Sequence, residues 1–131
     1  MPDFDGYEPP DVIDAAERFV SKMNESELHA EIDATERALS PQSRAMLAEA
    51  IFDAFRQRGE SSEDAAEEAG ADLSAIAGGD ESAIRTLIGY AKKNPGLLKE
   101  AAVALIENHP PIVGQLSAGL REGIAAKLGD R

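Results

Sequence analysis

The stretch SAIRTLIGYAKKNPGLLKEAAVALIENHPPIVGQLSAGLREGIAAKL, residues 82–128, decides the fold of this chain. Turn signals interrupt it at Asn94-Pro95 and again at Pro110-Pro111, and two branched aliphatic side chains follow soon after each interruption. Between the turns, apolar residues recur at intervals of three and four, which is the period of a helix with one buried face. The stretch therefore predicts three consecutive helices, over about residues 81–93, 95–108 and 110–128.

The first half of the chain predicts three more helices, over about residues 11–23, 25–39 and 41–58. Asn24, Ser40 and Asp80 each stand just before a periodic segment, where their side chains are suited to cap a helix N-terminus. Residues 60–79 hold few large apolar side chains and several glycines, so we expect a surface connector that contains a short helix. No stretch alternates with a period of two over the length of a strand.

The predicted fold class is all-α: a compact bundle of six or seven short helices joined by tight Pro/Gly turns. We expect an extended N-terminal arm over residues 1–10 and a single helical domain over residues 11–131. Within the domain, residues 11–59 form an acidic three-helix lobe, residues 60–79 the connector and residues 80–128 an apolar three-helix lobe. The Gly119-x-x-x-Gly123 spacing predicts close approach of a neighbouring backbone to the last helix.

The charge of the chain is uneven. The net charge is −12, and it belongs to residues 1–70, which hold 18 Asp and Glu against 6 Lys and Arg, whereas residues 71–131 hold 7 of each kind. Such a surface repels nucleic acid and anionic membranes, and it suits a basic protein partner or serves solubility alone. The absence of Cys excludes a disulfide framework and thiolate metal sites.

The sequence shows no targeting signal. The N-terminus lacks a basic start followed by an apolar run, so we expect no signal peptide. The longest aliphatic run, residues 101–106, is far shorter than the roughly 20 residues that a membrane-spanning helix needs. These features predict a cytoplasmic protein without a membrane span.

One helix face carries a candidate metal site. Glu25, His29 and Asp33 are spaced four residues apart and Glu36 lies near the same line, so these side chains share one side of a helix. A His flanked by carboxylates can bind a divalent metal, and paired carboxylates build di-iron centres in helical bundles. The Glu-x-x-His pattern of those centres is absent, because Ser26 stands in place of the Glu. The alternative is a solvated face with favourable charge spacing.

No catalytic constellation stands out, so we expect no enzyme and no cofactor. No Ser lies in a nucleophile elbow, no glycine-rich phosphate loop is present, and His109 sits between Asn108 and two prolines, where it suits a helix end. The basic residues Arg85, Lys92, Lys93 and Lys99 are too few to predict nucleic-acid binding. A further open alternative is that the acidic half acts as a decoy that binds a nucleic-acid-binding protein.

The helix starts Asn-Pro-Gly-Leu-Leu, at residues 94–98, and His-Pro-Pro-Ile-Val, at residues 109–113, resemble those of co-chaperone domains of the Hop and ubiquilin type. The resemblance covers about residues 84–120, and the chain lacks the Met- and Gln-rich filling of that family. It implies a helical groove that accepts an apolar helix of another protein.

The leading hypothesis is a non-catalytic protein–protein interaction module, such as an adaptor, an assembly subunit or a small helical chaperone. The partner would be a protein that is basic or presents an apolar helix, and a homo-oligomer is an open alternative. For each candidate contact residue the competing interpretation is packing in the core. The predicted partner-binding residues lie on the apolar helices: Leu97, Val103, Ile112, Leu116 and Leu120.

Overall fold

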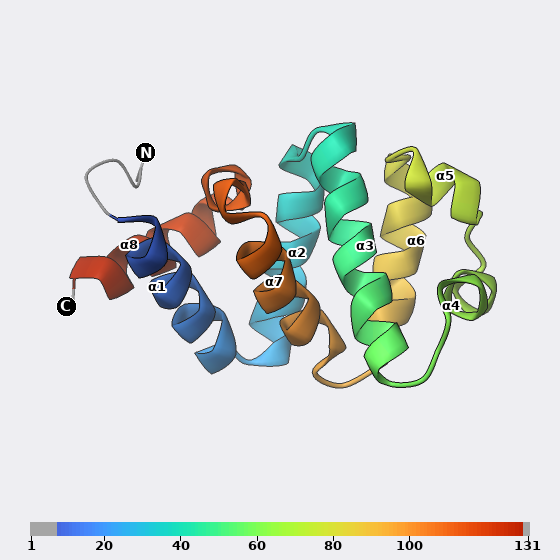
Figure 1. Cartoon of the computed structure of the whole chain (residues 1–131), viewed down its shortest axis with the longest axis horizontal. Coiled ribbons are helices and arrows are strands. Elements are labelled where there is room, and N and C mark those ends of the chain that lie inside the picture. The colour runs from blue at the N-terminus through green and yellow to red at the C-terminus, as the bar shows by residue number, and fades with distance from the viewer. Residues whose placement is uncertain (1–7, 130–131) are drawn as a thin grey trace.

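The computed structural model describes residues 8–129, and that part of the chain is helical without any strand (Figure 1). The all-α class is confirmed, but the helices are more numerous than the six or seven expected. The predicted arm over residues 1–10 lies outside the described part up to residue 7. The elements are α1 (Pro9–Lys22), α2 (Glu25–Ala38), α3 (Pro41–Gln57), α4 (Ser62–Ala69), α5 (Leu73–Ala77), α6 (Glu81–Ala91), α7 (Leu97–Asn108), the 3-10 helix η1 (Pro110–Gln115) and α8 (Ala118–Gly129).

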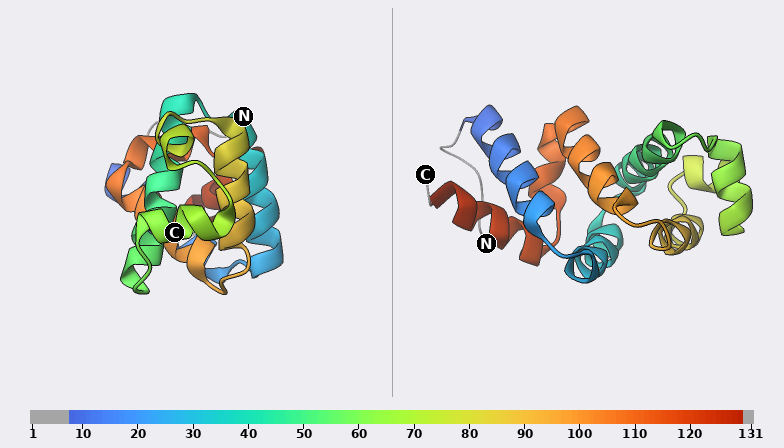
Figure 2. Two further views of the ribbon diagram at one scale, coloured as in Figure 1. Left: turned by 90° about the vertical axis from the view of Figure 1, so that its right-hand side faces the viewer. Right: turned by 90° about the horizontal axis from the view of Figure 1, so that it is seen from below.

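Helices from the two halves of the sequence interleave. α7 lies between α1 and α3 and contacts both, α8 packs on α1, and α6 packs on α2 and α3 (Figure 1). Viewed from below, the helices form a row that runs from α8 and α1 at one end to α4 and α5 at the other (Figure 2). Because α1, α2 and α3 make their main contacts with later helices, they do not form a lobe of their own.

Three predicted helix starts, at Asn24, Ser40 and Asp80, are confirmed, whereas the helix expected from Pro95 begins at Leu97 after Gly96 in the left-handed conformation. The Asn24 Oδ1 accepts a hydrogen bond from the Glu27 backbone N–H at 2.8 Å, and the Ser40 Oγ accepts one from the Ser43 N–H at 3.2 Å. The Asp80 carboxylate caps α6 at 2.8 Å from the Ala83 nitrogen. Side-chain capping starts α2 without a Pro or Gly in the turn, and at α3 the Ser40 cap acts together with Pro41 at the first helical position.

The last predicted helix, residues 110–128, is in fact two elements. η1 ends at Gln115, and Ser117 starts α8: the Ser117 Oγ accepts a hydrogen bond from the Leu120 N–H at 3.3 Å. The Ser117 N–H donates a hydrogen bond to the Thr35 Oγ1 of α2 at 3.0 Å, and not to a carbonyl oxygen of the preceding turn. This cap and this long-range bond break the helix, which the apolar spacing alone did not indicate.

Residues 60–79 lie largely at the surface, but they contribute Ala65, Ala66 and Ile76 to the core. Ser61 caps α4 and Gly70 ends it in the left-handed conformation, as the composition suggested. α5 then turns Ile76 inward, where this side chain and Ala65 of α4 are buried in the same cluster as the rest of the core.

The Gly119 and Gly123 positions of α8 receive side chains and not a neighbouring backbone. A Cβ atom at Gly123 would overlap the ring of Phe19 on α1, and one at Gly119 would overlap the carboxylate of Glu31 on α2. The predicted close approach exists, but its partners differ from the expectation. Within residues 8–129, no helix is both long and apolar enough to cross a membrane.

Candidate functional site

Four of the five predicted partner-binding residues are buried within the single chain. Leu97, Ile112, Leu116 and Leu120 are buried, and Val103 is half-buried against the core. The predicted surface on these helices is therefore wrong. The physical reason is that α7 has neighbours on both sides, so a helix that is apolar around most of its circumference is an interior helix. Similarly, η1 packs on α7 and α1, and α8 packs on α1, which buries the apolar side chains that these two elements carry.

The predicted metal-binding side chains take separate structural partners. The Glu25 carboxylate accepts a hydrogen bond from the Gly96 N–H, and Asp33 pairs with Lys92 at 2.6 Å. His29 is half-buried on the same helix. Among residues 8–129 no three His, Asp or Glu side chains converge as metal ligands would. The shared face of α2 serves instead to dock that helix on α6 and α7.

Glu36 is an acid with an unusual environment. Its side chain is 1% exposed, the Oε1 atom has no hydrogen-bond partner, and the Oε2 atom lies 3.7 Å from a guanidinium nitrogen of Arg85. Burial raises the pKa of Glu36 above its usual 4.5; Arg85, Arg44 and Arg37 oppose the rise, and Glu81 adds to it. The folded protein therefore binds a proton at Glu36 more tightly than the unfolded chain does.

Replacing Glu36 by Gln is expected to stabilise the protein at pH 7 by about 1 kcal/mol, because the substitution removes a buried charge. Folding raises the pKa of Glu36, so this carboxyl contributes its full stabilisation to the folded state below pH 4.5. Its contribution to the free energy of unfolding is lost as the pH rises through the folded pKa. The advantage of Glu36→Gln should thus shrink towards pH 4. Urea unfolding at several pH values measures it, with the exposed Glu122→Gln as control; a gain independent of pH would contradict this account.

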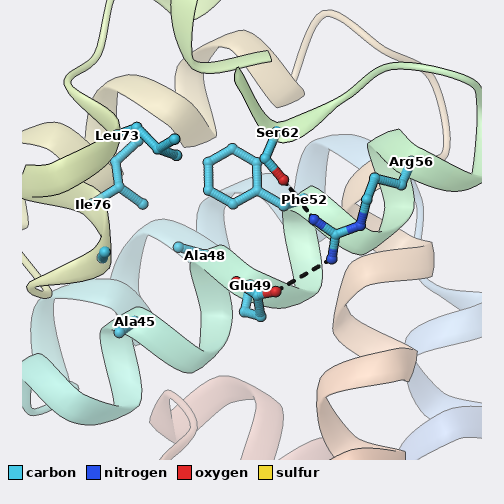
Figure 3. A pocket seen from close by; sticks show the side chains of 9 residues that line it. Ala45, Ala48, Glu49, Phe52, Arg56, Ser62, Leu73 and Ile76 are labelled. Carbon is cyan, nitrogen blue, oxygen red and sulfur yellow. Dashed lines mark hydrogen bonds and ion pairs between the residues drawn. The ribbon is translucent and has the colours of Figure 1, made fainter. Parts of the chain in front are cut away.

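The structure offers a different candidate site between α3 and α5. A hollow of about 150 Å³ is floored by Ala48, Phe52 and Ile76, and half-buried Leu73 forms part of its wall (Figure 3). Its polar end is formed by Arg56 of α3, which lies 3.2 Å from Glu49 and also donates a hydrogen bond to the Ser62 Oγ at the start of α4 (Figure 3). The hollow thus has an apolar floor, and polar atoms form much of its edge.

A second, more open hollow of about 470 Å³ adjoins the first, since Ala45 and Ala77 line both. Met46 borders it and is 36% exposed, and among the described side chains it is the one large apolar group classed as exposed. We refer to the two hollows together as the α3–α5 groove. Its lining residues are Pro41, Gln42, Ala45, Met46, Ala48, Glu49, Phe52, Arg56, Ser62, Leu73, Ile76, Ala77 and Gly78.

Arg44 holds the open end of the groove in place. Its guanidinium donates to the carbonyl oxygens of Leu39 at 2.8 Å, Gly79 at 2.9 Å and Glu36 at 3.3 Å. These bonds tie the end of α2 to the loop after α5. Gly79, at φ +80°, lies against the Pro41 backbone so closely that an added Cβ would be 2.7 Å from the Pro41 carbonyl carbon. The groove is therefore preformed.

The sequence reasoning missed this groove because it assigned residues 60–79 to a connector. Two signals could have indicated it. Ala48 and Phe52 form a second stripe of α3 beside the main one, and that stripe needs a cover. Leu73 and Ile76 stand three residues apart between glycines, which fits one helical turn that supplies this cover.

Comparison with known proteins gives no further guide to the site. No protein-family model, no curated protein and no solved structure matches this chain.

Proposed function

We propose that this protein is a non-catalytic protein–protein interaction module, of the adaptor, assembly-subunit or small-chaperone kind, and that it binds through the α3–α5 groove. One observation carries the proposal: the groove combines an apolar floor with Met46, the exposed large apolar side chain of the described part. Elsewhere the apolar helices turn their side chains into the core. A hollow with an apolar floor and a few polar groups at its edge is typical of a binding site.

The chemistry of the lining supports a protein ligand. A closed apolar cavity of about 150 Å³ holds a group of the size of benzene, so the deeper hollow has room for about one aliphatic or aromatic side chain. Met46 is unbranched and flexible, and such side chains adapt to the shape of a partner. Glu49 and Arg56 at the rim supply charged groups that orient the ligand.

Site-specific photo-crosslinking tests the proposal. Met46→benzoylphenylalanine in the native host is expected to give discrete protein adducts, which excess unmodified protein suppresses. The matched control is Ala126→benzoylphenylalanine, on an exposed position of α8 at the far end of the molecule (Figure 1). Adducts at position 46 with none at position 126 support the groove as the binding site. Equal adducts at both positions, or none at position 46, would refute it.

A further inference from the structure

The chain segment from Glu60 to Glu81, on one side of the groove, carries charge of one sign, whereas Arg56 in the α3 wall is paired with Glu49 and Asp53. Between residues 60 and 81 the chain has eight Asp and Glu and no Lys or Arg, and seven of these eight side chains are exposed. This segment includes α4 and α5, which form one end of the molecule (Figure 2). Ser62 of α4 and Leu73, Ile76 and Ala77 of α5 line the groove, so the acidic segment and the apolar wall are one structure.

Two of these carboxylates stand where the local electrostatics disfavours a negative charge. Glu67 and Glu68 lie in the last turn of α4, where the helix dipole disfavours negative charge, and no basic residue stands in that turn. The ion pairs between described residues include neither of them. A charge that breaks a local rule without a compensating contact inside the fold is characteristic of a functional surface.

Glu67 and Glu68 lie about one and a half helical turns from the groove rim, on other faces of α4 than Ser62. Five residues separate Ser62 at the rim from Glu67, which corresponds to about 8 Å along a helix. The Debye length at physiological ionic strength is also about 8 Å, so these carboxylates act on a ligand in the groove as a screened long-range field that strengthens at low salt.

The shape of the groove favours a helical ligand. Its α3 wall runs from Pro41 to Arg56, about 22 Å at the rise of an α-helix. Ala45, Ala77 and Gly78 line the open part with small side chains, which leave room for a backbone to approach. Since the described part has no strand, it offers no sheet edge to which an extended peptide could add.

We infer, building on the binding function proposed above, that the α3–α5 groove binds a short amphipathic helix of a partner protein that carries Lys or Arg beside one or two aliphatic side chains. One aliphatic group enters the hollow floored by Phe52 and Ile76, and the basic groups face the carboxylates of α4. A second copy of this chain is a poor occupant, because its net charge of −12 would oppose the same acidic segment.

Three synthetic helical peptides of equal length test this inference by fluorescence anisotropy with the full chain. The first places Leu residues on one face and Lys on the other, the second replaces Lys by Glu, and the third replaces Leu by Ser. Only the first is expected to bind. Its affinity should fall about tenfold in Ala77→Trp, which fills the groove at an exposed position, and stay unchanged in Ala126→Trp.

A charge-matched pair of variants tests the role of the acidic segment. Glu67→Gln/Glu68→Gln should weaken binding of the Lys–Leu peptide several-fold at low salt, whereas Glu8→Gln/Glu122→Gln, at the opposite end, should change it little. Equal binding of the Lys–Leu and Lys–Ser peptides, or no effect of Ala77→Trp, would show non-specific attraction and overturn the inference. If no peptide binds while crosslinking at position 46 succeeds, the groove binds a partner of other chemistry: the inference fails and the proposed function stands.

Discussion

Leu97→Ala is expected to lower the free energy of unfolding by about 2–5 kcal/mol, the range for a large aliphatic side chain deleted from a core. Leu97 is fully buried at the start of α7, the helix that lies between α1 and α3. The cavity left behind would have packed helices around it and little freedom to collapse. Urea unfolding followed by circular dichroism measures the loss.

Val103→Ala is the matched control on the same helix. Val103 is half-buried, and its truncation removes less apolar area, so the loss should stay below about 1.5 kcal/mol. Both residues belong to the sequence pattern that suggested a binding face. If Leu97→Ala had no larger effect than Val103→Ala, Leu97 would not occupy an interior position.

Gly79→Ala is expected to destabilise the protein by about 2–5 kcal/mol. The left-handed conformation at φ +80° costs a residue with a Cβ about 1–2 kcal/mol by itself. At Gly79 the new Cβ also meets the Pro41 backbone, at 2.7 Å from its carbonyl carbon and 2.9 Å from its Cα, and backbone cannot rotate away as a side chain can. Relief of the clash would separate α3 from the loop after α5.

Gly70→Ala separates the two contributions. Gly70 has the same φ of +80°, but no atom lies within 4 Å of a Cβ built there, so this variant carries the conformational penalty alone. Thermal and urea unfolding of the two variants should therefore differ by about 1–3 kcal/mol, the usual penalty for forcing extra atoms into packed surroundings. Equal losses would mean that the Pro41–Gly79 approach is looser than the structure shows.

The local features of the fold were predictable from the sequence. Asn24, Ser40 and Asp80 start helices as expected, because a capping side chain needs only the backbone three residues further on. The apolar stripe of α3, including Ile51 and Phe55, is buried as its spacing indicates. Local chemistry determines such features, and a single sequence contains it.

The features that depend on distant neighbours were not predictable. Whether Leu97 and Leu120 face a partner or the core depends on where α1 and α3 lie, and helical periodicity carries no information on that. The same holds for Ser117, whose bond to Thr35 spans 82 positions. The groove combines residues from 41 to 78 across three helices, so its lining emerges only from the packed structure.

The central claim of this account is that residues 82–128 turn their apolar side chains inward and that exposed apolar surface lies at the α3–α5 groove. Paramagnetic relaxation of methyl signals by a soluble gadolinium chelate tests it most directly in the intact chain. The Met46 methyl should relax strongly, while the methyls of Leu97, Ile112 and Leu120 should stay protected. Strong relaxation of the leucine and isoleucine methyls together with a protected Met46 would contradict the account.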